Sequence, residues 1–303
     1  MKGPLKMTSK RTLAICTAFF LCAIWPLLLQ AGSDHPQPFS TVHVNDIDIA
    51  YHDFGAGDPI VMIMGYGGAM DLWSPRLLRI LSASHHLFIF DNRGVGHSTS
   101  SDMEYSIPLF AADTLGLMDA CGIDKAAVLG WSMGAEIALQ LAISHPDRVG
   151  SLILISASPG GREQVVPDAD VLRRLTDTSG GFLARGLRLI SLLFPSGWLN
   201  AHPAVWSYFP VNATVSPPQR TRRQLKAMED WGGAASRLCE ILCPTLIITG
   251  NQDVVFPAQN SVLLAAGING SQLIQFPEGG HGVMFQYPDK IAEEIDAFTA
   301  QTH

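Results

Sequence analysis

A serine between two glycines, at the junction of a predicted strand and a predicted helix, most constrains this chain. Residues 126–129 form an apolar run, residues 130–134 read Gly-Trp-Ser-Met-Gly, and residues 135–141 have a helical composition. This G-x-S-x-G pattern predicts a sharp turn that lifts Ser132 clear of the strand end, where it can act as a nucleophile. The glycines permit so tight a turn, and the helix start favours negative charge beside the serine. Taken alone, the pattern also fits an ordinary glycine-rich turn.

Two further strand ends carry the groups that a serine nucleophile requires. Residues 245–250 form a buried apolar run that is followed by Asp253, and residues 271–276 form another that is followed by His281 in a Gly-Gly-His-Gly sequence. A nucleophilic serine needs a base to accept its proton and an acid to orient that base. We therefore expect Ser132, Asp253 and His281 to form a catalytic triad.

Other blocks complete a resemblance to a known family. Residues 64–68 (Met-Gly-Tyr-Gly-Gly) with Trp73 resemble an oxyanion loop, and residues 91–98 (Asp-Asn-Arg-Gly-Val-Gly-His-Ser) resemble a D-x-R-G-x-G-x-S turn. With the chain order Ser, Asp, His, these blocks make residues 40–300 similar to the α/β hydrolase superfamily, in its serine esterase and haloperoxidase-like branch. One departure is visible: the family often has His-Gly where this chain has Met64-Gly65, but only the backbone after that glycine takes part.

The resemblance implies an eight-stranded, mostly parallel sheet with helices on both faces and an inserted helical cap at about residues 159–233. The alternation of apolar strands and helices along residues 42–155 points independently to a parallel sheet covered on both faces. We expect one hydrolase domain over residues 39–303. In that fold the backbone N–H groups of Tyr66 and Met133 would bind the oxyanion, with Gly67 as the alternative to Tyr66.

Aromatic residues near the serine and in the predicted cap are candidates for an apolar acyl pocket. We expect Trp131, Phe194, Trp198 and Trp206 to bind substrate. The alternative is that each simply holds the cap together.

The first 31 residues have the pattern of an export signal. Four basic residues, at positions 2, 6, 10 and 11, precede an apolar run at residues 12–29, and residues 1–31 contain no acidic residue. Small residues follow the apolar run. This pattern is typical of a cleaved signal peptide, or of a signal-anchor that attaches the protein to a membrane through residues 12–29. Residues 32–38 read as a linker, and we expect a periplasmic, secreted or membrane-anchored hydrolase domain.

Composition and spacing exclude several other classes. The chain is 47% hydrophobic with a net charge of −7, which suits a globular domain and argues against nucleic-acid binding. The histidines lack metal-ligand spacing, and Met70 stands where a dinucleotide loop needs its third glycine. We therefore expect no metal and no cofactor.

The expected function is hydrolysis of a small or medium apolar ester through an acyl-enzyme. The resemblance also allows perhydrolysis of the haloperoxidase-like kind, or hydrolysis of an amide, a lactone or a C–C bond, on the same triad. From a different class, the fold could serve as a non-catalytic ligand-binding module, although an intact triad argues against it.

Overall fold

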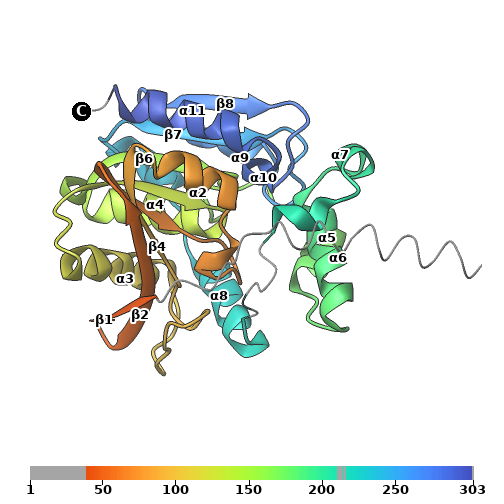
Figure 1. Cartoon of the computed structure of the whole chain (residues 1–303), viewed down its shortest axis with the longest axis horizontal. Helices are drawn as coiled ribbons and strands as arrows, with labels where there is room; N and C mark the ends of the chain where they lie inside the picture. The colour runs from red at the N-terminus through yellow and green to blue at the C-terminus, as the bar shows by residue number, and fades with distance from the viewer. Residues whose placement is uncertain (1–38, 210–213, 215, 302–303) are drawn as a thin grey trace, which may run out of the picture. The chain divides into compact units, whose positions relative to one another are not determined.

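A single eight-stranded sheet organises the protein (Figure 1). In the computed structural model, which describes residues 39–209, 214 and 216–301, its order is β1-β2-β4-β3-β5-β6-β7-β8. β1 and β2 pair antiparallel, β2 and β4 pair antiparallel, and every later pair is parallel. This arrangement confirms the predicted fold class. The strands are β1 (Ser40–Val44), β2 (Ile47–Gly55), β3 (Asp58–Ile63), β4 (His85–Phe90), β5 (Ala126–Trp131), β6 (Val149–Ile155), β7 (Thr245–Gly250) and β8 (Gln272–Phe276).

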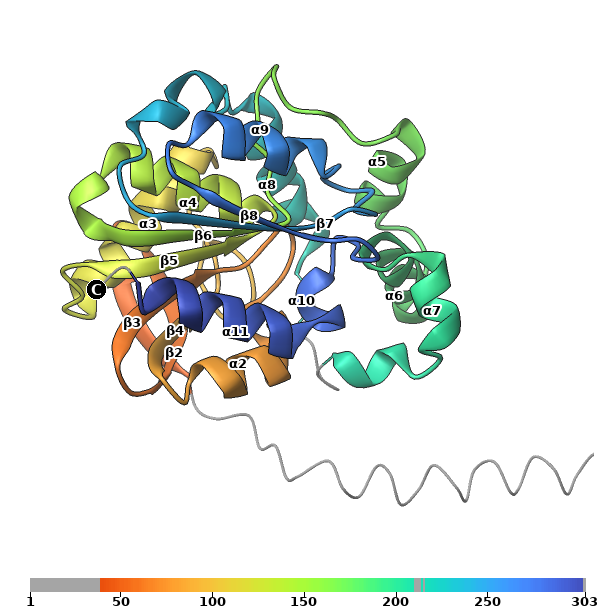
Figure 2. The same ribbon diagram turned by 90° about the horizontal axis from the view of Figure 1, so that it is seen from above.

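Helices cover both faces of the sheet, as Figure 2 shows. On one face lie α3 (Ile107–Ala120), α4 (Met133–Ser144) and α9 (Gln259–Gly267), and on the other lie α2 (Pro75–Leu81) and α11 (Pro288–Thr299). Each layer has its own buried apolar cluster against the sheet. Because both faces are covered, the central strands are apolar throughout: all six residues of β7 are buried.

The parallel strands bring the predicted site residues to one edge of the sheet. The loops after β3, β5, β7 and β8 carry Tyr66, Ser132, Asp253 and His281 respectively. In a parallel sheet these carboxyl ends lie on the same side, which is where ligands of such folds bind.

The chain between β6 and β7 is a long, mostly helical segment. Its helices α5, α6 and α7 lie together beyond one end of the sheet, while α8 lies apart from them (Figures 1 and 2). In this part of the chain, the helices and helical turns are α5 (Ala169–Thr176), α6 (Phe182–Leu193), α7 (Ser196–Ala201), η3 (Val205–Tyr208), α8 (Pro218–Asp230) and η4 (Ala235–Glu240). The remaining short elements are η1 (Met70–Leu72), η2 (Pro146–Arg148) and α10 (Val283–Gln286).

The predicted leader (residues 1–31) and linker (residues 32–38) lie outside the described residues. Within the described part, no helix has the length and hydropathy needed to cross a membrane.

Candidate functional site

The turn between β5 and α4 places Ser132 in a strained backbone conformation. Its φ of 57° is one that residues with a side chain rarely adopt. The two flanking glycines are required by space: a Cβ on Gly130 would lie 2.2 Å from the Gly134 oxygen, and one on Gly134 would lie 2.0 Å from the Ile63 oxygen. The sequence motif is therefore a tight elbow in three dimensions, with Ser132 at its apex and α4 starting directly after it.

Ser132, His281 and Asp253 form a continuous row of hydrogen bonds. The His281 Nε2 lies 2.9 Å from the Ser132 Oγ, and the His281 Nδ1 lies 2.8 Å from the Asp253 Oδ2. The second oxygen of Asp253 accepts hydrogen bonds from the N–H groups of Val255 and Phe256, at 2.8 and 2.9 Å. All three side chains of the row are buried. The carboxylate is thus fixed from both sides, and it holds the imidazole with Nε2 directed at the serine.

The backbone of His281 is held by two residues from neighbouring strand ends. Its carbonyl oxygen accepts a hydrogen bond from the Trp131 Nε1 at 3.0 Å and another from the Ser156 Oγ at 3.0 Å. Ser156 follows β6 with a φ of 49°. Sequence reasoning missed this contact because it joins residues 125 positions apart; the only signal was the place of Ser156 at a strand end.

The loop after β3 runs against Ser132. A Cβ on Gly65 would lie 3.0 Å from the Ser132 Cβ, so this glycine lies directly beside the serine. The N–H groups of Tyr66 and Met133 donate to no acceptor within residues 39–209, 214 and 216–301, whereas the Gly67 N–H donates to the Gln224 Oε1 at 2.8 Å. Of the Tyr66 and Gly67 N–H groups, the Tyr66 N–H is therefore the one that can donate to a ligand.

The turn after β4 supports that loop from the core side. Asn92 donates to the Met64 carbonyl oxygen at 2.9 Å, and Asp91 accepts hydrogen bonds from the N–H groups of Met70 and His97, both at 2.7 Å. Burial nevertheless raises the pKa of Asp91. The D-x-R-G-x-G-x-S block therefore has a bracing role in this structure.

A small, mostly apolar cavity of about 60 Å³ adjoins the serine. This volume is several times the roughly 10–15 Å³ that one water molecule requires. The lining combines Tyr66, Trp131, Ser132 and His281 with aliphatic and aromatic residues from several elements: Leu175, Leu189, Leu192, Leu193, Leu225, Met228, Val255 and Phe256.

Of the four aromatic residues predicted to bind substrate, only Trp131 lines this cavity. Phe194 is buried and stacks on Trp198 with a centroid distance of 4.7 Å, while Trp206 is 43% exposed. A Cβ on Gly282 would lie 3.0 Å from the Phe194 ring, which places that ring against the loop of His281. Phe194 and Trp198 thus belong to an aromatic cluster that packs against Phe285 of α10, and the residues of α5, α6 and α8 that line the cavity are aliphatic side chains.

Glu136 is a buried carboxyl on α4, one helical turn after Ser132. It is 2% exposed, and its Oε2 has no hydrogen-bond partner among the described residues. Desolvation raises its pKa well above the ordinary value. Sequence reasoning did not single it out.

The described residues include no group of three or more His, Cys, Asp or Glu side chains arranged to hold a metal ion. In the same part of the chain, Cys121, Cys239 and Cys243 are free thiols.

Comparison with known proteins places the chain in a family. Residues 58–288 match the family model described as "alpha/beta hydrolase fold". A candidate carbamate hydrolase, RutD, from Azorhizobium caulinodans is 29% identical over 262 residues, covering 86% of this chain and 97% of the relative. A candidate non-heme bromoperoxidase, BpoC, from Mycobacterium tuberculosis is 29% identical over 276 residues, covering 84% and 98%.

Among solved structures, a thermophilic esterase from Thermogutta terrifontis superposes with a TM-score of 0.75, covering 88% of this chain and 100% of that protein. At 23% identity this likeness bears on the fold. The family match, the sheet order and the strand-end positions of the serine, acid and histidine agree, and the chain belongs to the α/β hydrolase fold family.

Proposed function

We propose that this protein is a serine hydrolase that cleaves a small, apolar carboxylic ester. The observation that carries the proposal is the hydrogen-bonded row from Asp253 through His281 to Ser132, beside a cavity that Ser132, His281 and Tyr66 line. The N–H groups of Tyr66 and Met133 have no acceptor among the described residues. These are the parts that acyl transfer needs: a nucleophile, an oriented base and donors for a developing oxyanion.

In the first half of the reaction, the Ser132 Oγ attacks the acyl carbon while the His281 Nε2 takes the serine proton. The carbonyl oxygen becomes an oxyanion, which accepts hydrogen bonds from the N–H groups of Tyr66 and Met133. Asp253 stabilises the imidazolium. When the C–O bond of the ester breaks, the proton on His281 passes to the leaving alkoxide, and the acyl group remains on Ser132.

In the second half, a water molecule replaces the alcohol. His281 takes a proton from this water as it attacks the acyl carbon, and a second tetrahedral oxyanion forms at the same amides. Its collapse breaks the bond to the Ser132 Oγ, which regains the proton from His281. The products are a carboxylic acid, an alcohol and free enzyme.

The cavity lining favours a short, uncharged acyl group. Apart from His281, none of its lining residues is ionisable at neutral pH, so no side chain there would neutralise a substrate carboxylate. Leucines from α5 and α6, together with Leu225 and Met228 from α8, line the same cavity as Ser132. We propose that the segment at residues 159–233 acts as the cap that excludes water from the acyl group and limits its size.

A probe that acylates or phosphylates serine tests the proposal. Wild-type protein should be labelled by a fluorophosphonate and should hydrolyse p-nitrophenyl acetate or butyrate faster than the octanoate, whereas the Ser132→Ala variant should do neither. Folded wild-type protein that is not labelled and hydrolyses no ester would refute the function.

The relatives give a specific reason to test two other substrates on the same serine. One is named as a candidate carbamate hydrolase and another as a candidate non-heme bromoperoxidase. A carbamate would be attacked by Ser132 as an ester is, and hydrogen peroxide could replace water in the second half to give a peracid. Release of amine from an aryl carbamate, and peracid formation from a short ester with peroxide, should be assayed beside ester hydrolysis.

We also propose that the hydrolase domain acts outside the cytoplasm. The basic start and apolar run of residues 1–31 support this location. N-terminal sequencing of protein from its native host tests it. A mature chain that begins near Gly32 supports cleavage, an intact membrane-bound chain supports an anchor, and a soluble full-length chain in the cytoplasm would contradict both.

A further inference from the structure

The loop beside Ser132 contains a β-turn whose central peptide can face two ways. The Gly68 N–H donates to the Gly65 carbonyl oxygen at 3.2 Å, which closes the turn over Tyr66 and Gly67. Gly67 has a φ of +68°, the value that a type II turn requires at its third position. Type I and type II turns differ by a flip of the central peptide, here the one that joins Tyr66 to Gly67.

Two side chains from the segment between β6 and β7 hold both polar groups of Gly67. The Gln224 Oε1 accepts from the Gly67 N–H at 2.8 Å, and the Ser216 Oγ donates to the Gly67 oxygen at 2.8 Å. Further along the loop, Asp71 accepts from the N–H and the Oγ1 of Thr214, at 2.7 and 2.8 Å. The loop beside the nucleophile is therefore fixed by residues about 150 positions later in the chain.

Gln224 is an unusual residue for this place. It is fully buried, yet its Nε2 has no hydrogen-bond partner among the described residues. A buried amide with an unsatisfied NH₂ group destabilises a fold. Within the described part of the chain, this side chain makes one hydrogen bond, which its Oε1 accepts from the Gly67 N–H.

Resting on the proposed function, we propose that Gln224 is a positioning residue that fixes the Tyr66–Gly67 peptide. By accepting the Gly67 N–H, it keeps that amide away from the substrate and holds the Tyr66–Gly67 peptide in its type II orientation. The Tyr66 N–H belongs to the preceding peptide and has no acceptor among the described residues. Tyr66, and not Gly67, is then the loop's donor to the oxyanion. Helix α8 thus supplies both part of the cavity wall, through Leu225 and Met228, and the geometry of the oxyanion loop.

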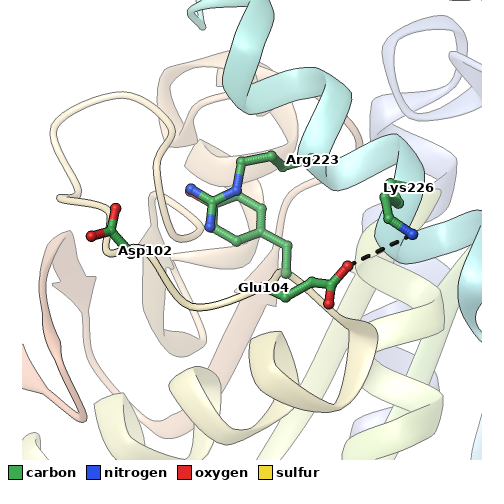
Figure 3. Close-up of a pocket in the computed structure, with 5 residues that line it drawn as sticks. Asp102, Glu104, Arg223 and Lys226 are labelled. Atoms are coloured by element: carbon green, nitrogen blue, oxygen red, sulfur yellow. Dashed lines mark ion pairs between the residues drawn. The ribbon is translucent and has the colours of Figure 1, made fainter.

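Helix α8 offers a matched control at the neighbouring residue. Figure 3 shows Arg223 and Lys226 of α8 in a surface pocket with Asp102 and Glu104. Arg223 donates to the Ser101 carbonyl oxygen at 3.0 Å and lies 3.7 Å from the centroid of the Tyr105 ring. These contacts attach α8 to the loop before α3, and none of them involves residues 64–70. Arg223→Met should therefore weaken the attachment of α8 while both hydrogen bonds to Gly67 remain.

The test compares Gln224→Met, which keeps the side-chain length but removes the acceptor, with Arg223→Met. For a short p-nitrophenyl ester, Gln224→Met should lower kcat at least tenfold with KM within threefold of wild type. It should also weaken inhibition by a short trifluoromethyl ketone at least tenfold, because the tetrahedral adduct needs the oxyanion donors. Arg223→Met should change neither value more than threefold.

Amide hydrogen exchange over residues 64–70 gives a readout that does not depend on activity. Exchange in this segment should become at least tenfold faster in Gln224→Met and stay at the wild-type rate in Arg223→Met. Wild-type exchange and wild-type kcat in Gln224→Met would overturn the positioning role, and so would equal effects in the two variants. If wild-type protein hydrolysed no ester, the proposed function would fail and the exchange rates would still decide whether Gln224 fixes the loop.

Discussion

Ser132 shows at the scale of one residue how the fold holds a strained backbone conformation in place. A φ of 57° costs a residue with a side chain on the order of 1–3 kcal/mol, and the surrounding fold must hold it in place. The elbow does so because Gly130 and Gly134 let β5, α4 and β3 approach closely. The same turn leaves the Ser132 Oγ within 2.9 Å of His281.

Replacing Ser132 separates its chemistry from its strain. Both Ser132→Ala and Ser132→Gly should lose ester hydrolysis and fluorophosphonate labelling, because neither side chain is a nucleophile. Glycine adopts a positive φ without steric cost, so the Gly variant should be the more stable of the two, by up to about 1–2 kcal/mol in the free energy of unfolding. It should therefore unfold at the higher temperature. Thermal unfolding of both variants measures this, and an Ala variant that is the more stable would contradict the strain.

The Asp253→Asn variant should keep the fold but lose most of the ester hydrolysis. Because one carboxylate oxygen accepts two backbone N–H groups, the asparagine oxygen should take that side and its NH₂ group should face the His281 Nδ1. The imidazole would then carry its proton on Nε2 and could not accept one from Ser132. We expect kcat to fall on the order of 10⁴-fold.

Glu278→Gln is the control for Asp253→Asn, because Glu278 is an exposed carboxylate three residues before His281. It should keep wild-type kcat. Near-wild-type turnover in Asp253→Asn together with an inactive Glu278→Gln would show that the acid is misassigned.

At the scale of an element, α4 combines the nucleophile's turn with a buried acid. The N–H of its first residue, Met133, has no acceptor among the described residues, and a helix N-terminus favours negative charge beside Ser132. Glu136 points into the same well-packed layer, where desolvation raises its pKa. The helix therefore carries a carboxyl that the fold keeps protonated above its ordinary range.

This raised pKa sets the sign of a pH effect on stability. Below the ordinary value near 4.5 the carboxyl is protonated in both states and its full contribution to stability is present. As the pH rises above that value, the unfolded chain loses the proton and the folded chain keeps it, so the free energy of unfolding falls until the folded pKa is passed. Glu136→Gln removes this dependence. Its stability relative to wild type should be greater at pH 8 than at pH 4.5.

Urea unfolding at the two pH values measures the Glu136 effect, with Glu293→Gln as the control. Glu293 is an exposed carboxylate on α11 that pairs with Lys290 at the surface. The control should show nearly the same difference from wild type at both pH values. A Glu136 variant that behaved in the same way would show that the buried carboxyl is ionised in the folded protein.

At the scale of the whole molecule, the parts that the sequence predicted are those with local signals. The strands before Ser132, Asp253 and His281 are short apolar runs that end in recognisable turns, so the parallel sheet and its active edge could be expected. Their convergence follows from strand direction alone.

The parts that could not be predicted are contacts between distant segments. Nothing in the sequence pairs Gln224 with Gly67 or Ser156 with His281, because each pair is set by how complete layers pack. Three of the four aromatic residues predicted to bind substrate do not line the cavity, for a related reason. Phe194 and Trp198 stack on each other, and composition does not distinguish aromatic residues that pack together from those that contact a substrate.

Because the sheet, both apolar clusters and the cavity are built from residues after position 39, the hydrolase domain should work without its first 38 residues. Residues 40–303 form one compact unit, and every residue that lines the cavity lies in it. We expect a chain of residues 39–303 to fold and to keep kcat/KM for a short ester within twofold of the full-length value. Its unfolding temperature should lie within about 2 °C of that of the full-length protein. For a domain of this size, that difference corresponds to on the order of 1 kcal/mol or less in the free energy of unfolding. Parallel purification of the two chains, with steady-state kinetics and calorimetry on each, provides the comparison. A shortened chain that is soluble but loses more than tenfold in kcat/KM would show that residues 1–38 take part in the site. A shortened chain that fails to fold would show that the domain begins earlier than Ser40.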